Sequence, residues 1–198
     1  MTTTNILAEN DAWIGLDDPT HNNGSGDNLE VFTRNISVSP TVYGVSNSSE
    51  TSAGIVVAGI ALYRFDVTTI AAASAVSSAI LHIYGGGSNL QAPAVTVFPI
   101  TDNSWTEGGV TWNNQPTHDS KIGSLDVFRK SMGTLSNAVN SDNGNAWQTL
   151  DITAYVASKI NGSAKDELML YPHTGYDFRT QFKSRSDSNA PYITVVYT

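Results

Sequence analysis

The chain has 198 residues, a hydrophobic fraction of 40% and a formal net charge of −8. This length suits one sizeable domain, and the hydrophobic fraction suffices for a packed core, which argues against a wholly disordered chain. Eighteen acidic against ten basic residues argue against a nucleic-acid-binding protein, which needs a basic surface. No apolar run approaches the roughly 18 residues of a membrane span. The lack of cysteine excludes disulfides, thiolate metal sites and a cysteine nucleophile.

The first ten residues, MTTTNILAEN, lack the basic and apolar regions of a signal peptide. We therefore expect Met1 to be a native start and the protein to be made in a cytoplasm. The alternative is a domain that was excised from a secreted enzyme. Residues 1–10 are predicted to form a polar N-terminal arm, and residues 11–198 a single domain, because no linker divides the remaining chain.

Seven segments rich in β-branched and aromatic residues alternate in hydrophobicity or form short apolar runs, as strands do. In chain order they are residues 28–33, 60–66, 79–84, 94–100, 147–152, 167–171 and 192–197. One short helix is expected over residues 154–160, with Thr153 as its N-cap. Because no longer helical pattern separates the strands, the predicted fold class is all-β: an antiparallel β-sandwich of the jelly-roll kind.

Motifs of the common catalytic sites are absent from the sequence. It contains no Gly-x-Ser-x-Gly elbow, no His-Glu-x-x-His and no EF-hand spacing, and Gly85-Gly-Gly87 is typical of a turn. The four histidines are scattered, and His82 is expected to be a packed or surface residue of its strand. The sequence therefore predicts a protein that is not an enzyme.

Several fragments occur in a familiar order along the chain. The most specific is Trp105-Thr-Glu-Gly-Gly-Val-Thr-Trp-Asn-Asn-Gln-Pro116, and weaker ones are residues 11–14, 22–31, 62–66, 78–84, 150–153 and 182–197. From about residue 9 to its end, the chain resembles DNRLRE-type domains and the related family 96 carbohydrate-binding modules. These are β-sandwich modules often attached to bacterial surface proteins and polysaccharide lyases. Two departures are Ser184-Arg185-Ser186, where the family has Ser-Arg-Glu, and a longer connection over residues 34–59.

The tryptophan motif has two readings. In the favoured, structural one, the rings of Trp105 and Trp112 anchor a loop over the sandwich, and Glu107 accepts hydrogen bonds from backbone N–H groups. In the functional one, a tryptophan stacks on a sugar while the amides of Asn113 and Asn114 bind its hydroxyl groups.

Glycan binding normally needs exposed rings beside amides and charges. Trp13 with Asp17 and Asp18 is one such place. Arg179 and Arg185 can bind a sugar carboxylate bidentately, and the resemblance implies acidic sugars, because some family members are linked to alginate. The excess of acidic residues argues against a polyanion, and a structural loop is the favoured reading of residues 171–179, with glycan binding as the alternative. The candidate glycan-binding residues are Trp112, Asn113, Asn114, Tyr171, His173, Tyr176, Arg179 and Arg185.

A structural Ca²⁺ is a further expectation, since modules of this type often hold one through carboxylates and carbonyls. Glu9, Asp11 and Asp187 are its candidate ligands, because the first and last strands of such sandwiches often lie close together. The alternative is that they are ordinary surface acids. No other cofactor is expected.

The function we expect first is that of a non-catalytic structural or adhesion protein on the surface of a bacteriophage particle, as head decoration (cement) or associated with the tail. The arm would dock through Ile6 and Leu7 on other virion proteins or on further copies, for example in a trimer. The alternative is the glycan-binding module of a secreted polysaccharide lyase or hydrolase, which would be extracellular. Neither nucleic acid nor a membrane is expected as a partner.

Overall fold

The computed structural model describes residues 1–16, 18–24, 26–35, 55–71, 74–87, 95–101, 104–118, 123–125, 146–160, 166–172 and 179–198. The described strands are β1 (Thr2–Gly15), β2 (Asn28–Asn35), β3 (Ile55–Phe65), β4 (Val76–Gly87), β5 (Val95–Pro99), β6 (Gly123–Leu125), β7 (Ala146–Asp151), β8 (Asp166–Pro172), β9 (Arg179–Lys183) and β10 (Tyr192–Tyr197). The helices are α2 (Thr153–Ile160) and the 3-10 turns η2 (Val67–Thr69) and η3 (Trp112–Asn114).

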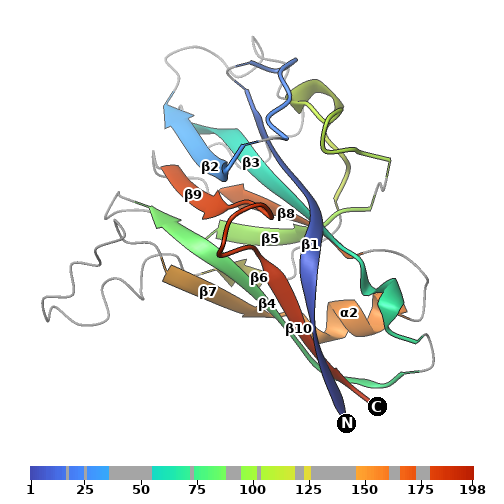
Figure 1. Ribbon diagram of the computed structural model, residues 1–198. Helices are drawn as coiled ribbons and strands as arrows, with labels where there is room; N and C mark the ends of the chain where they lie inside the picture. Colours follow the sequence, from blue (N-terminus) through green and yellow to red (C-terminus); the bar gives the residue numbers. More distant parts are fainter. Residues whose placement is uncertain are drawn as a thin grey trace, which may run out of the picture.

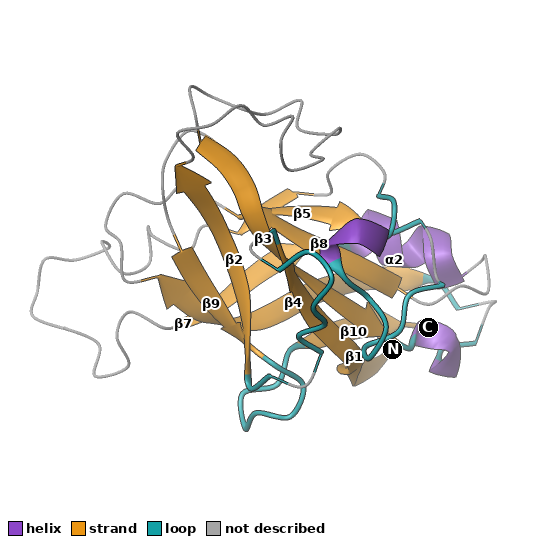
Figure 2. Cartoon of the chain, turned by 90° about the horizontal axis from the view of Figure 1, so that it is seen from above, coloured by secondary structure: helices purple, strands orange, loops and turns teal. Residues whose placement is uncertain are grey.

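Six strands close into an antiparallel barrel in the order β1-β10-β4-β9-β2-β3, because β1 also pairs with β3 (Figures 1 and 2). Strands β8, β5 and β6 extend the sheet beyond β3, and β7 pairs with β4. The predicted all-β class with a short helix is confirmed. The predicted sandwich is only partly right, since these strands form one continuous sheet that closes on itself.

Strand β1 closes the barrel by changing partners along its length. Its first half pairs with β10, from Thr2 opposite Tyr197 to Leu7 opposite Tyr192. Its second half pairs with β3, and a register shift between Ala8 and Asn10 marks the change. Such a bulge bends a strand and increases its twist. The polar arm predicted over residues 1–10 is therefore part of the sheet. Of its two predicted docking residues, Ile6 is buried in the core and Leu7 is exposed.

Two hydrophobic clusters hold the barrel together. The larger includes Phe65, Ile83 and Phe182, all fully buried. The smaller includes Trp105 and Trp112, which are only 5% and 6% exposed. Burial of both rings anchors the segment 104–118 on the barrel, in line with the structural reading of the tryptophan motif.

Helix α2 occupies nearly the predicted residues and buries Val156 and Ile160. Its first turn is capped by Asp151 instead of Thr153: the Asp151 carboxylate accepts the Thr153 N–H at 2.9 Å and the Thr153 hydroxyl at 2.6 Å. Within the described ranges, no helix has the length and apolar character needed to cross a membrane.

Candidate functional site

An aromatic platform lies on the outer face of the barrel, and we define it by His82, Tyr84, Trp147 and Tyr192. His82 and Tyr84 alternate along β4 with the buried Leu81 and Ile83, so their side chains point away from the core. Register brings the other two rings beside them, because Tyr192 of β10 lies opposite His82, and Trp147 of β7 lies opposite Tyr84. All four side chains are half-buried.

The rings of the platform contact one another in two orientations. His82 and Tyr192 stack with centroids 4.3 Å apart and an interplanar angle of 9°. Trp147 lies 5.4 Å from both Tyr84 and Tyr192, with its plane inclined by 68° and 70° to theirs. The cluster therefore presents ring faces and ring edges within one continuous patch.

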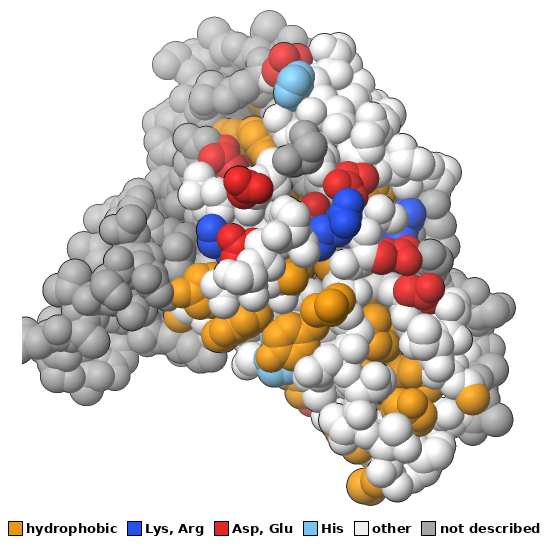
Figure 3. Space-filling view, in the orientation of Figure 1, with side chains coloured by type: hydrophobic (Ala, Val, Ile, Leu, Met, Phe, Trp, Pro, Cys, Tyr) orange, Lys and Arg blue, Asp and Glu red, His pale blue; other side chains and the backbone are white. Residues whose placement is uncertain are grey.

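Polar and apolar side chains on the same sheet face surround the platform. Leu7, 63% exposed, lies opposite Tyr192 at one end, and the exposed Thr149 lies opposite His82 at the other. Beside this row, the Thr194 hydroxyl donates to Asn5 Oδ1 at 2.9 Å and lies 3.2 Å from His82 Nε2. Figure 3 shows hydrophobic side chains gathered over the region of β4, β10 and β1, with the charged ones gathered above them.

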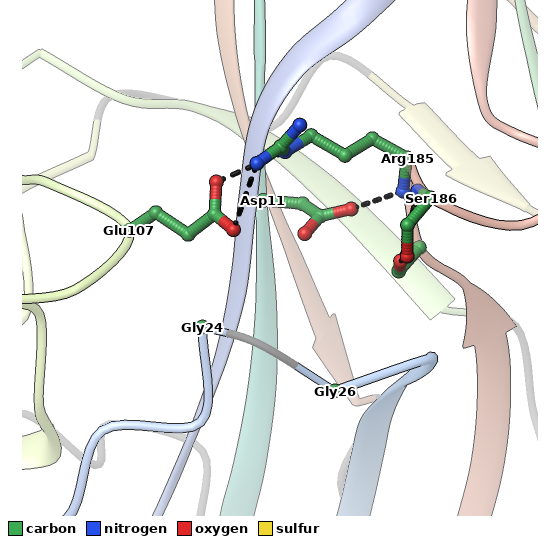
Figure 4. Close-up of a pocket in the computed structure, with 7 residues that line it drawn as sticks. Asp11, Gly24, Gly26, Glu107, Arg185 and Ser186 are labelled. Atoms are coloured by element: carbon green, nitrogen blue, oxygen red, sulfur yellow. Dashed lines mark hydrogen bonds and ion pairs between the residues drawn. The ribbon is translucent and has the colours of Figure 1, made fainter.

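A second feature is a polar pocket of about 220 Å³ between β1 and the loops that follow β9 and precede η3 (Figure 4). Its charged residues are Asp11, Glu107 and Arg185. The Arg185 guanidinium binds the Glu107 carboxylate bidentately, at 3.0 Å from Nε and 3.1 Å from Nη2. The backbone N–H of Arg185 donates to the Asp11 carboxylate.

Burial sets the charge state of Asp11. The residue is only 2% exposed, and removal of its carboxyl from water raises the pKa from 3.8 to about 6. The hydrogen bond from the Arg185 backbone opposes this rise, while the negative charge of Glu107 adds to it. The pKa of the Asp11 carboxyl thus lies between the usual value of an aspartate and neutral pH.

The pocket is also a fastening point between distant segments. The Asn22 side-chain amide donates to the carbonyls of Glu107 and Val110, both at 2.7 Å. Arg64 donates to the Trp105 carbonyl at 2.8 Å, and its guanidinium lies 4.6 Å from the centroid of the Trp105 ring. These contacts hold the segment 104–118 against β3 and against the loop between β1 and β2, beside the pocket.

The predicted residues of the tryptophan motif serve mainly this anchoring. Trp112 is buried, so its ring offers no free face to a sugar. The Asn114 side chain bonds its own loop, accepting the Thr111 N–H at 2.5 Å and donating to the Gly109 carbonyl at 3.0 Å. Asn113 is exposed. Glu107, expected to accept backbone N–H groups, instead pairs through its carboxylate with Arg185.

The other glycan-binding candidates do not come together in the described structure. Tyr171 lies in β8 and Arg179 in β9, on strands that flank β3 and β2, and their side chains are outside the described part. His173 and Tyr176 lie outside the described residues. Trp13 is half-buried and packs edge-on against Phe32, with centroids 6.2 Å apart. Of its predicted neighbours, Asp18 accepts a bond from Thr20, and Asp17 is outside the described residues.

Two of the calcium ligands predicted from the sequence, Asp11 and Asp187, have different partners in the structure. The Asp11 carboxylate bonds the Arg185 backbone, whereas Asp187 pairs with Lys183 at 3.1 Å and accepts the Asn189 N–H at 2.8 Å. Across the described ranges, no three His, Asp or Glu side chains, those of Glu9, Asp11 and Asp187 included, are grouped to hold a metal ion.

The platform was not predicted from the sequence. Its signal was present, since Tyr84, Trp147 and Tyr192 occur at the ends of three predicted strands. The information that was lacking is strand register, which sets these rings side by side although they are up to 108 positions apart (84 to 192).

The sequence matches the model of a family described as carbohydrate-binding module family 96 over residues 2–197. This span includes every described strand and all four rings of the platform. No curated protein matches the chain.

Proposed function

Because the chain belongs to carbohydrate-binding module family 96, we propose that it is a non-catalytic module that binds a glycan on the aromatic platform. The observation that carries the proposal is the cluster of four half-buried rings on an outward sheet face. Rings in such a place are costly to leave in water and are suited to contact a ligand that has an apolar face.

A sugar ring matches this surface chemically. Its C–H faces are apolar and pack on aromatic rings, and its edge carries hydroxyl groups that need hydrogen-bond partners. Asn5, Thr149 and Thr194 supply amide and hydroxyl groups on the same sheet face as the rings. The platform therefore combines stacking surface with polar groups at its margin.

The polar pocket supports glycan binding less well. Its volume of about 220 Å³ is small, below the usual range of about 300–1,000 Å³ for ligand pockets. Both carboxylates already bond Arg185, and none of the described residues that line the pocket is aromatic. A ligand there would have to break contacts that fasten the segment 104–118.

The docking contact predicted for a virion role used Ile6 and Leu7, and their positions do not favour such a contact. Ile6 is only 7% exposed and packs in the core, so it is unavailable to a partner. Leu7 is exposed, but it lies beside the platform on a strand of the barrel. These positions favour the glycan-binding alternative, with a polysaccharide as the partner.

The test is to replace Trp147 with alanine and to measure binding to a panel of polysaccharides by affinity electrophoresis. We expect a loss of at least about fivefold, because removal of an aromatic anchor from an interface commonly costs 1–2 kcal/mol or more. The matched control is Tyr155→Ala on α2, whose half-buried ring lies 5.5 Å from Lys159 Nζ and outside the platform.

Circular dichroism and thermal unfolding accompany both variants, so that a binding loss caused by misfolding is recognised. The proposal is supported if Trp147→Ala loses binding while it remains folded and Tyr155→Ala retains it. It fails if the folded Trp147→Ala variant binds as the parent does, or if the parent binds no polysaccharide.

A further inference from the structure

Building on the proposed function, we infer that His82 makes the ligand preference of the aromatic platform depend on pH. His82 lies between Tyr192 of β10 and Thr149 of β7, which are opposite it on either side. When its ring is protonated, the platform gains a positive charge and should hold carboxylate-bearing glycans more tightly. The affinity of the platform for neutral glycans should stay the same.

Two side-chain contacts fix how the His82 ring is held. The Thr194 hydroxyl donates its single proton to Asn5 Oδ1 at 2.9 Å. The same oxygen lies 3.2 Å from His82 Nε2, so it acts there as the acceptor and Nε2 carries a hydrogen. Nε2 is protonated in one neutral tautomer of histidine and also in the imidazolium ion. The contact therefore persists when the ring gains a proton at Nδ1, and protonation changes the charge of the platform without releasing the ring.

The stack of His82 on Tyr192 also tolerates both charge states. The two ring centroids are 4.3 Å apart and the planes are inclined by only 9°. A neutral imidazole packs on the phenol ring as one aromatic ring does on another, and a cation is attracted to the same ring face. The positive charge thus arises beside the rings on which a sugar would pack.

Several other titratable side chains surround His82 on this outer face. Tyr84 follows on β4 and Tyr192 is opposite on β10, and tyrosine ionises only in alkaline solution. Asp151 lies on the neighbouring β7, and hydrogen bonds from the side chain and backbone of Thr153 lower the pKa of Asp151. Its carboxylate is therefore ionised throughout the range from pH 5 to pH 8.

One basic side chain lies on the same outer face. By its register with β4, Lys183 of β9 lies beside Tyr84, and its ammonium group pairs with Asp187 at 3.1 Å. A lysine and an aspartate both keep their charges between pH 5 and pH 8. Asn5 and Leu7, which β1 contributes to this face, are uncharged. Of the described groups around it, the histidine alone is of a type that gains charge as the pH falls from 8 to 5.

A charge on His82 acts differently on the two kinds of glycan. Carboxylates are largely ionised at pH 5 and above, so a protonated ring attracts those of an acidic sugar and leaves a neutral sugar unaffected. In water, two opposite charges about 5 Å apart change an affinity by about fourfold. Salt screens such an attraction between exposed charges. The effect is therefore large enough to measure and has a second signature in its salt dependence.

The experiment is isothermal titration of the full chain with polymannuronate and with glucomannan, at pH 8 and pH 5 in 50 mM NaCl. We expect the affinity for polymannuronate to rise at least about threefold at pH 5, and that for glucomannan to change less than about twofold. The rise should be smaller in 500 mM NaCl. His82→Gln places an amide near Nε2, where it can donate to Thr194, but this amide gains no proton. The variant should therefore abolish the rise.

His118→Gln is the matched control. The His118 ring also packs on an aromatic ring, that of Phe98 at 4.5 Å between centroids, but outside the platform. This variant removes the same charge from the chain as a whole, so it separates a local effect from a change in net charge and should keep the rise. Asp11, with a pKa of about 6, titrates in both variants, so their comparison cancels its contribution. Circular dichroism at each pH shows whether both variants stay folded.

The outcomes separate this inference from the proposed function. A rise that persists in folded His82→Gln, or that His118→Gln also loses, overturns the inference, as does the lack of a rise in the parent. Binding of glucomannan without any binding of polymannuronate overturns it too. In each of these cases the proposed function stands if binding still needs Trp147. If neither polymer binds, the inference falls, and the polysaccharide panel described above decides whether the proposed function falls with it.

Discussion

At the scale of single residues, Asp11 is a carboxyl that is buried in the folded protein. A buried carboxyl costs stability when it is ionised, and here that cost is only partly offset by the N–H of Arg185. The neighbouring Arg185 guanidinium is turned to Glu107 instead. The Asp11 carboxyl is therefore protonated more readily in the folded state than in the unfolded state.

This difference predicts how stability depends on pH. The folded-state pKa of Asp11 is about 6, against 3.8 as the usual value, so between these pH values the folded state binds more protons and stability falls as pH rises. Asp11→Asn keeps an oxygen acceptor for the Arg185 N–H and removes the ionisation. In urea denaturation, its free energy of unfolding relative to the parent should rise by about 1–3 kcal/mol from pH 4 to pH 7.

Asp187→Asn is the matched control for this series. Hydrogen bonds, that from the Asn189 backbone foremost, lower the pKa of Asp187, so this group is ionised in both states above pH 4.5 and its contribution is lost only at lower pH. The difference between Asp187→Asn and the parent should be constant from pH 4.5 to 7. A constant difference for Asp11→Asn as well would contradict the raised pKa.

At the scale of elements, the sequence predicted strands wherever alternation was strong. The segment 192–197 matches β10 residue for residue, and 28–33 lies within β2. The pattern of β1 was missed because Thr, Asn and Glu fill most of its outward positions, Leu7 breaks the alternation there, and only Ile6 and Ala8 in its first half face the core. The strand forms nevertheless, because the backbone N–H and C=O groups of its first half pair with those of β10.

The register of β1 is tested by its two adjacent apolar residues. Ile6 is buried in the large cluster and Leu7 is 63% exposed. Ile6→Ala should therefore lower the free energy of unfolding by about 2–4 kcal/mol, and Leu7→Ala should change it by less than about 0.5 kcal/mol. Thermal and urea unfolding of the pair measure both values. Equal, small effects would mean that residues 1–10 form a free arm after all.

At the scale of the whole molecule, pairing between strands that are far apart in the sequence assembles both candidate sites. The pocket needs β1, the segment 104–118 and the turn after β9, and the platform needs β4, β7 and β10. The sequence pointed to some of the residues involved, namely Asp11, Arg185 and the two anchoring tryptophans. It could not predict their neighbours, because pairings such as Leu7 with Tyr192 join residues that no local pattern relates.

Pairing of β1 with β10 also brings the two ends of the chain together. Thr2 lies opposite Tyr197 on adjacent strands, and both termini are seen side by side in Figure 1. Backbone cyclisation through a short Gly-Ser linker between Met1 and Thr198 should therefore raise the melting temperature without straining the barrel. Removal of chain entropy from the unfolded state contributes at most about 5 kcal/mol for a loop of this length. The control carries the same linker residues without the closing bond, and polysaccharide binding should be the same in both forms. A cyclised protein that melts below its open control would contradict the pairing of β1 with β10, because only ends held apart would make the short linker pull the fold out of shape.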